Sequence, residues 1–259
     1  MRKTRISAFG RVIGALLIRE MITRYGRSPG GYVWAFVEPA GMILILALAI
    51  SQFVHVPPLG TSFVLFYASG YLPFHAFNDI AAVTSQSIHV NRQLLHLPRV
   101  RPLDTVIARF LLSLLTLIVV ATLILGVMVV GLGERFGIEL EPLLAGLGAA
   151  AALGLGVGTL NVVLFHFVPL WERLWPIINR PLFLISAVFF TLESMPRHIQ
   201  ALLDWNPLVH VVGTVRLAFY PTYRGEYADL GYVLAFAAAT FLIGAGLLMR
   251  HAGRFVEDV

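Results

Sequence analysis

The chain is 259 residues long, and 58% of its residues are hydrophobic whereas 13% are charged. Soluble globular proteins carry about 25% charged residues, so this composition excludes a water-soluble globule and indicates an integral membrane protein. A net charge of +5 suits nucleic-acid binding, but the basic residues cluster between apolar runs, as at a cytoplasmic membrane face, so we expect no nucleic-acid partner. The chain has no cysteine, which excludes disulfides, iron–sulfur clusters and thiolate zinc sites.

Residues 1–30 are predicted to form an amphipathic helix on the cytoplasmic membrane surface. Apolar residues recur with helical spacing from Phe9 to Leu16, and arginines lie off that stripe. Glu20 and Arg24 follow at a spacing of four, which places them on one face of the helix. Two interpretations stay open for this pair, a surface ion pair and a contact with a soluble partner. Charged residues follow the apolar stretch where a signal peptide needs small ones, so we expect no cleaved signal peptide.

Residues 28–31, Ser-Pro-Gly-Gly, are predicted to break that helix and direct the chain into the bilayer. Tyr32 and Trp34 then suit anchors at headgroup depth. Glu38 lies about 10 Å further along, and it should face the protein interior or water because a lipid-exposed carboxylate costs roughly 2.5–3.5 kcal/mol. The open alternatives for Glu38 are pairing within the bundle and a role with substrate or protons.

Six apolar stretches are long enough to cross a hydrocarbon core of about 30 Å. The predicted spans are residues 31–54, 62–87, 103–130, 143–168, 176–192 and 230–249. Fifteen Lys and Arg residues lie on one side of these spans and four on the other, so the positive-inside rule places both termini in the cytoplasm. The expected fold class is an all-α, multi-pass integral membrane protein.

We expect a single transmembrane domain over residues 1–259. Prolines interrupt the segment between the fifth and sixth spans, which is too broken to cross the bilayer and is predicted to form re-entrant or interfacial helices. The predicted parts are the surface helix 1–30, spans one to five within 31–192, the re-entrant segment 193–229, the sixth span within 230–250 and a cytoplasmic tail 251–259.

Aromatic residues of the second predicted span fall within an arc of roughly 140° when they are projected on a helix. They are Phe63, Phe66, Tyr67, Tyr71, Phe74 and Phe77. One interpretation is packing against lipid or neighbouring helices. The other is the wall of a conduit, because aromatic faces stack on the C–H faces of sugar rings and Gly70 leaves a gap on the same side.

The loop after the second span is predicted to lie on the cytoplasmic side and to carry a docking surface. Residues 91–96 are expected to form a short helix that ends before Pro98. Its apolar residues Leu94 and Leu95 are surrounded by arginines at the tip of a loop, which is typical of a surface that binds a partner.

Three arginines lie on the predicted outer side in segments otherwise poor in charge: Arg197, Arg216 and Arg224. Guanidinium groups pair with carboxylates and phosphates, so these residues suit attraction of an acidic polymer or a lipid phosphate. The alternative is anchoring at the headgroups of the outer leaflet.

The chain lacks the motifs that catalysis of its own would need, and we expect no catalytic residues. Lys3 is its one lysine, so the Gly-Lys-Ser/Thr sequence of a phosphate-binding loop is absent, and we expect no nucleotide hydrolysis by this chain. The histidines are scattered, so we expect no metal site. Gly154 and Gly158 lie within an apolar span, where their spacing predicts a face for close helix packing.

Three segments, RYGRSPGGYVWAFVEP, NRQLLHLPRVRP and LESMPRH…WNPLVHVVGTVR, occur in this order along the chain. Together they resemble the membrane subunit of polysaccharide-exporting ABC transporters of the ABC-2 permease type, most closely the capsular polysaccharide export permeases of Gram-negative bacteria. The resemblance covers essentially the whole chain. Pro29 and Gly30 depart from the family, whose members more often have a larger residue followed by Gly at the helix break.

The resemblance implies a homodimer in the bacterial inner membrane, bound to two ATPase subunits that carry ATP and Mg. It also implies a lipid-linked acidic polysaccharide as substrate and export partners in the periplasm and outer membrane. Alternatives are export of O-antigen or another lipid-linked glycan, and a drug or lipid ABC permease. A membrane-embedded enzyme is a further alternative, but the intramembrane polar residues are too dispersed to build an active site.

The same resemblance assigns roles to the loop after the second span and to the re-entrant segment. The residues expected to couple to the ATPase are Glu20, Arg24, Asn91, Leu94, Leu95, Pro98, Arg99 and Arg101. Those expected to line a substrate conduit are Tyr32, Trp34, Glu38, Phe66, Tyr67, Tyr71, Phe74 and Phe77. Those expected at an outer gate are Pro196, Arg197, Asn206, Pro207, His210 and Arg216.

Overall fold

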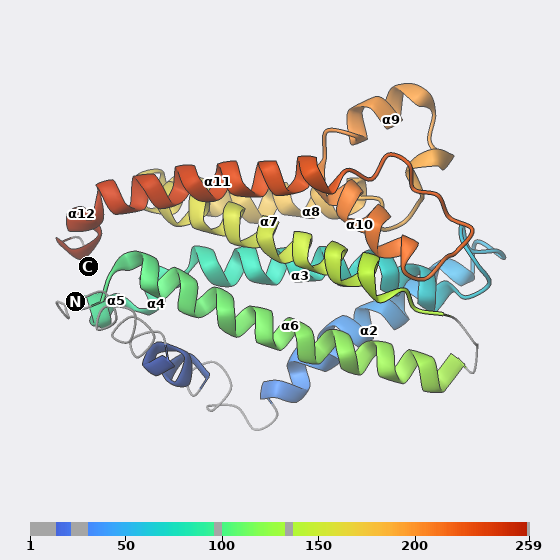
Figure 1. Ribbon diagram of the computed structural model, residues 1–259, viewed down its shortest axis with the longest axis horizontal. Coiled ribbons are helices and arrows are strands. Elements are labelled where there is room, and N and C mark those ends of the chain that lie inside the picture. Colours follow the sequence, from blue (N-terminus) through green and yellow to red (C-terminus); the bar gives the residue numbers. More distant parts are fainter. Residues whose placement is uncertain (1–13, 22–30, 96–99, 133–136, 258–259) are drawn as a thin grey trace.

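The computed structural model describes residues 14–21, 31–95, 100–132 and 137–257. The regular secondary structure of these residues is helical throughout, as the composition predicts. The long helices run along one axis of the molecule (Figure 1). They are α2 (Gly31–Ser51), α3 (Phe63–Ser85), α6 (Pro102–Leu132), α7 (Leu140–Phe167), α8 (Pro169–Ile185) and α11 (Leu230–Arg250).

Short helices gather at the two ends of this bundle (Figure 1). At one end lie residues 14–21, α4 (Ser87–Val90), α5 (Arg92–Leu95) and α12 (Ala252–Glu257). At the other lie the 3-10 turn η1 (Leu192–Ser194), α9 (Arg197–Leu203) and α10 (Pro207–Leu217). We call these the α4/α5 end and the α9/α10 end.

Helix α7 forms the centre of the bundle because small residues let its neighbours approach closely. It packs against α3 on one side and α11 on the other. A Cβ added to Gly158 would lie 2.7 Å from the Thr84 Cβ of α3, and one added to Gly156 would lie 2.4 Å from the Ala237 carbonyl oxygen of α11. The predicted close-packing face at Gly154 and Gly158 is therefore confirmed.

Within the described residues, four helical segments are long and apolar enough to cross a bilayer: Val33–Ser51, Pro102–Gly131, Leu140–Phe167 and Leu230–Arg250. They correspond to the first, third, fourth and sixth predicted spans. Helix α3 covers the second predicted span and lies inside the bundle, where most of its side chains are buried.

The fifth predicted span, residues 176–192, has different bounds in the structure. Helix α8 begins seven residues earlier, at Pro169, and ends at Ile185. Proline is well suited to the first position of a helix, because the N–H that it lacks has no intrahelical partner there. Arg173 and Arg180, two of the fifteen basic residues assigned to one side of the predicted spans, consequently lie on one helix.

Candidate functional site

A cluster of buried polar side chains joins three elements at the α4/α5 end. Asn91 caps the C-terminus of α4, and its side chain is only 1% exposed. Its Nδ2 donates to Glu20 Oε1 at 2.7 Å and to the Ser87 carbonyl oxygen at 3.1 Å. Its Oδ1 accepts from Arg19 Nη1 at 2.7 Å. One amide therefore binds both a carboxylate and a guanidinium of the helical segment 14–21.

Arg109 of α6 completes this cluster. Its Nε lies 3.7 Å from Glu20 Oε2, and its Nη1 donates to the Gln86 carbonyl oxygen at 3.0 Å. The buried Glu20 carboxylate thus has partners on two other elements, which offset the cost of removing its charge from water. We call Arg19, Glu20, Asn91 and Arg109 the polar junction.

The sequence identified half of the polar junction. Glu20 and Asn91 were expected to act at a partner interface, but their contact with each other was not foreseen. Arg19 and Arg109 were missed, although Arg109 lies within the third apolar stretch, where an arginine needs a polar partner. The expected Glu20–Arg24 pair involves Arg24, which lies outside the described residues.

The expected docking surface is partly internal. Leu95 is buried in an apolar cluster with Val106 and Phe255, so its expected exposure at the loop tip is wrong. The short helix is present as α5, on which Leu94 is half-buried. Arg101 is exposed, and its backbone N–H donates to Asp104 Oδ2 at 3.0 Å. Pro98 and Arg99 lie outside the described residues.

At the α9/α10 end, Arg216 of α10 is fully buried. Its Nη1 donates to the Phe190 carbonyl oxygen at 2.7 Å and its Nη2 to that of Val188 at 3.3 Å. Its Cζ lies 4.4 Å from the centre of the Phe66 ring. The hypothesis that Arg216 attracts polymer or headgroups does not hold in this conformation, because its guanidinium already binds the segment after α8.

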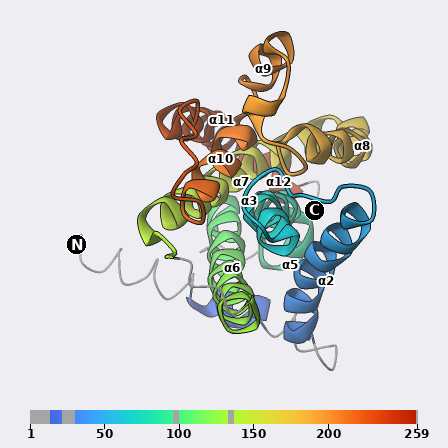
Figure 2. The same ribbon diagram turned by 90° about the vertical axis from the view of Figure 1, so that its right-hand side faces the viewer.

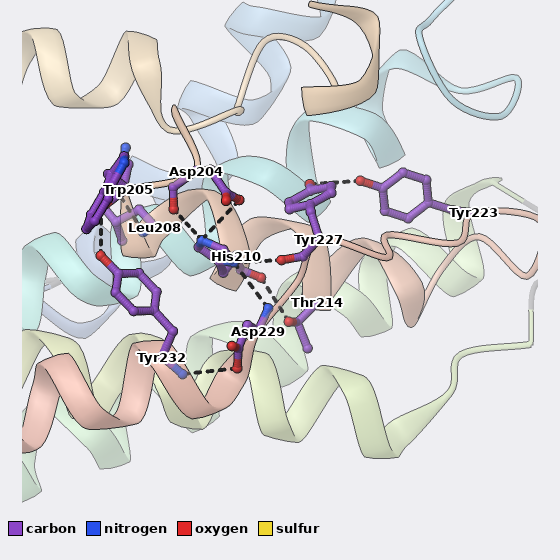
Figure 3. Close-up of polar contacts among 10 residues, drawn as sticks. Asp204, Trp205, Leu208, His210, Thr214, Tyr223, Tyr227, Asp229 and Tyr232 are labelled. Carbon is purple, nitrogen blue, oxygen red and sulfur yellow. Dashed lines mark hydrogen bonds and ion pairs between the residues drawn. The ribbon is translucent and has the colours of Figure 1, made fainter. Parts of the chain in front are cut away.

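His210 connects three segments of the same end (Figure 3). Its Nε2 donates to the Asp204 carbonyl oxygen at 2.7 Å. Its Nδ1 accepts from the Asp229 backbone N–H at 3.1 Å and lies 2.9 Å from the Tyr227 carbonyl oxygen. Figure 3 also shows the Tyr223 and Tyr227 hydroxyls, 2.9 Å apart. Burial raises the pKa of both hydroxyls, so they remain protonated.

Asn206 fixes the start of α10. Its Oδ1 accepts from the Leu208 backbone N–H at 3.0 Å, and its Nδ2 donates to Ser186 Oγ at 3.2 Å just after α8. Pro207 is the first residue of the helix. The structure therefore places Asn206, Pro207, His210 and Arg216 on or next to α10. Pro196 and Arg197 stand apart from them, exposed at the start of α9.

The aromatic residues of α3 do not line an open passage in this chain. Tyr67 packs on Phe189 with ring centres 6.2 Å apart, and Tyr71 packs on Phe183 at 5.9 Å. The gap expected at Gly70 is filled, because a Cβ there would lie 3.1 Å from the Val188 backbone. The first interpretation of the aromatic arc, packing against neighbouring helices, therefore fits its buried residues, which are Phe66, Tyr67, Tyr71, Phe74 and Phe77.

Other expected conduit residues lie on α2. Trp34 and Glu38 are both exposed on that helix. The side chain of Tyr32 lies outside the described part. Over the described ranges, no three His, Asp or Glu residues come together as a metal site would require.

Residues 11–220 match the ABC-2 type transporter family. The chain is 37% identical over 237 residues to the polysialic acid transport protein KpsM of Escherichia coli, and the overlap covers 91% of each chain. It is 31% identical over 244 residues to the capsule polysaccharide export inner-membrane protein CtrC of Neisseria meningitidis, covering 93% of this chain and 91% of CtrC. It is 26% identical over 256 residues to BexB of Haemophilus influenzae, also named a capsule polysaccharide export inner-membrane protein, covering 98% and 96%. The chain therefore belongs to the ABC-2 type transporter family.

Proposed function

We propose that this chain is the membrane subunit of an ATP-driven exporter that moves a lipid-linked acidic capsular polysaccharide across the bacterial inner membrane. The observation that carries the proposal is the 37% identity to a polysialic acid transport protein over 91% of both chains. Two further relatives are named for capsule polysaccharide export and are matched over more than nine-tenths of this chain.

In this proposal α2, α3, α6, α7, α8 and α11 cross the membrane. The α4/α5 end faces the cytoplasm, because Arg19, Arg92, Arg101 and Arg250 gather there and the positive-inside rule favours that side. Both termini are then cytoplasmic. The α9/α10 end faces the periplasm, where α9 and α10 form an outer gate and meet the periplasmic and outer-membrane export partners.

ATP and Mg are bound by two separate ATPase subunits, since this chain has no phosphate-binding loop. Helix α5 and the loop after it dock on the ATPase. The polar junction supports this role because it ties that loop to the segment 14–21 and to α6. A displacement of α5 by the ATPase would therefore be passed to a long helix of the bundle.

Two copies of the chain form the functional permease, with the glycan path between them. Helices α2 and α8 lie on the same side of the molecule, flanking α3 (Figure 2). Exposed apolar residues occur on both, including Trp34 and Leu48 of α2 and Leu184 of α8. A second copy seated on this side would cover part of that surface.

The proposal is tested by deleting the gene in its host and locating the surface glycan. We expect acidic glycan to accumulate in the cytoplasm and to leave the cell again when the wild-type gene is restored. An unchanged surface glycan with altered drug tolerance would contradict the proposal and favour a drug permease. Loss of a different lipid-linked glycan would favour O-antigen export.

A further inference from the structure

Helix α8 is held to the bundle along one side only, and none of its residues is fully buried. Trp171 Nε1 donates to Asn161 Oδ1 of α7 at 3.0 Å, and Glu172 Oε1 accepts from Gln86 Nε2 at 3.3 Å. The side chain of Asn179 is hydrogen-bonded to that of Asn78 on α3. These contacts fix the rotation of α8 about its axis.

That rotation turns two arginines away from the bundle. Arg173 and Arg180 are seven residues apart, which separates them by about 10 Å along the helix and about 20° around it. Both are exposed, and they lie about 130° around the helix from the side that contacts α3 and α7. Neither guanidinium has a hydrogen bond or ion pair with any residue that the structure describes.

The two arginines sit at different depths. Glu172, beside Arg173, contacts Gln86 just beyond the end of α3, whereas Asn179, beside Arg180, contacts Asn78 seven residues inside that helix. Arg180 therefore lies alongside apolar helices, and an arginine facing lipid at such a depth is costly. It needs water or an anion opposite it.

We propose that Arg173 and Arg180 form an anion track on α8, along which carboxylate or phosphate groups of the exported glycan enter the transporter. This inference rests on the proposed function and names the residues that select an acidic substrate. Guanidinium groups bind carboxylates and phosphates in a bidentate geometry, and a relative is named for transport of polysialic acid, whose sugars carry carboxylates. The 10 Å step along α8, about two helical turns, lets one chain contact both arginines in succession.

Membrane lipid is the less favoured occupant. A headgroup phosphate at the end of α3 is at the level of Arg173, but Arg180 lies about 10 Å further along the helix. The carboxylate nearest in sequence, Glu172, does not neutralise the track because it is hydrogen-bonded to Gln86 on another side of α8.

Export assays in the deletion strain test the track. We expect Arg180→Gln to lower glycan export by about tenfold, as for loss of a charge-assisted contact, and Arg180→Glu to lower it further. Arg180→Lys keeps the charge but loses the bidentate geometry, so it should export more than Arg180→Gln and less than wild type. Arg250→Gln is the matched control, an exposed arginine at the same end on α11, and should leave export unchanged. Equal membrane levels of each variant and of its bound ATPase exclude misfolding as the cause.

Normal export by both Arg180→Gln and Arg180→Glu would overturn the track while leaving the proposed function intact. Normal export by the deletion strain itself would instead overturn the proposed function. These two failures are therefore distinguishable in one set of strains.

Photo-crosslinking identifies what the arginines face. Ile177 lies between them along the helix and is 62% exposed, so a photoreactive phenylalanine analogue there should give adducts with the host's acidic glycan. The next residue, Ile178, is 44% exposed but turned about 100° further away, and it serves as the control. Adducts at Ile177 with phospholipid alone, or with a second copy of the chain alone, would overturn the proposal.

Discussion

The guanidinium of Arg216 is held by two backbone carbonyl oxygens and an aromatic ring. The segment after α8, from Ser186 to Thr191, is not helical, so its carbonyl oxygens need donors from elsewhere. Arg216 supplies two such donors from α10, and Gly70 of α3 leaves the space in which Val188 lies. One arginine thus fixes the connection between α8 and the proposed gate.

We predict that Arg216→Ala lowers the stability of the purified permease by about 3 kcal/mol, because two buried carbonyl groups lose charged donors. The matched control is Arg224→Ala, since Arg224 is exposed and forms a surface ion pair, with its Nη1 3.7 Å from Glu226 Oε1. That change should cost less than about 1 kcal/mol. Unfolding in detergent measures both variants, and equal stability of the two would contradict this assignment.

The sequence placed Arg216 on the outer side, which stays a prediction, and it did not indicate that the side chain is buried. An arginine in a segment poor in charge is usually exposed, and its partners here are backbone carbonyls, which no residue type reveals. His210 is similar, because its hydrogen bonds to the described residues are with the main chain. Such sites become visible only when the path of the backbone is known.

Among the elements, α7 shows how spacing of small residues determines which helices meet. Gly158 lies against Thr84 and Ala81 of α3, whereas Gly148 of the same helix has no atom within 4 Å of the position of a Cβ. The two glycines therefore differ in packing but share their helical backbone.

We predict opposite effects for alanine at these two positions. Gly158→Ala should destabilise the bundle by about 1–3 kcal/mol, because α3 and α7 must separate to accept a methyl group. Gly148→Ala should stabilise it by up to about 1 kcal/mol through higher helix propensity. Thermal unfolding of the purified variants gives the sign, and destabilisation by both would argue against close packing as the role of Gly158.

A third prediction concerns the polar junction and whether it makes the segment 14–21, the loop after α3 and α6 move together. Asn91→Leu removes the amide that binds Arg19 and Glu20, so the segment 14–21 loses its hydrogen bonds to the loop after α3. We expect ATP hydrolysis by the complex to persist while glycan export falls at least about tenfold. Gln52→Leu, an exposed amide just after α2 and away from the α4/α5 end, is the control and should export normally. Parallel loss of both activities would instead indicate that the ATPase no longer binds.

The boundaries of α8 show where prediction from hydropathy fails for a single helix. A search for apolar runs excluded Glu172 and Arg173 and so moved the fifth span toward residue 192. In the structure both charged residues lie within helix α8, with Glu172 hydrogen-bonded to Gln86 and Arg173 turned away from the bundle. The apolar residues after Ile185 belong to the turn that Arg216 holds. An apolar run reveals depth in a membrane, but it does not distinguish a helix from a buried turn.

For the whole molecule, the all-helical class, the long helices and the central role of the glycines in α7 could be predicted from the sequence. The sequence could not predict which side of each helix faces the inside of the bundle. Periodicity places the aromatic residues of α3 in one arc, but it does not tell whether that arc meets a conduit or Phe183 and Phe189. The structure shows that Arg173 and Arg180 of α8 are exposed. These two arginines are now the stronger candidates for contact with substrate.

The measurement that tests the central claim most directly uses inverted membrane vesicles that contain this chain and its ATPase. Acidic glycan added outside with its lipid anchor should enter the vesicles when ATP is present and become protected from a glycan-degrading enzyme. Vesicles without the chain, or without ATP, should leave the glycan fully degradable. Equal protection in vesicles with and without the chain would contradict the account.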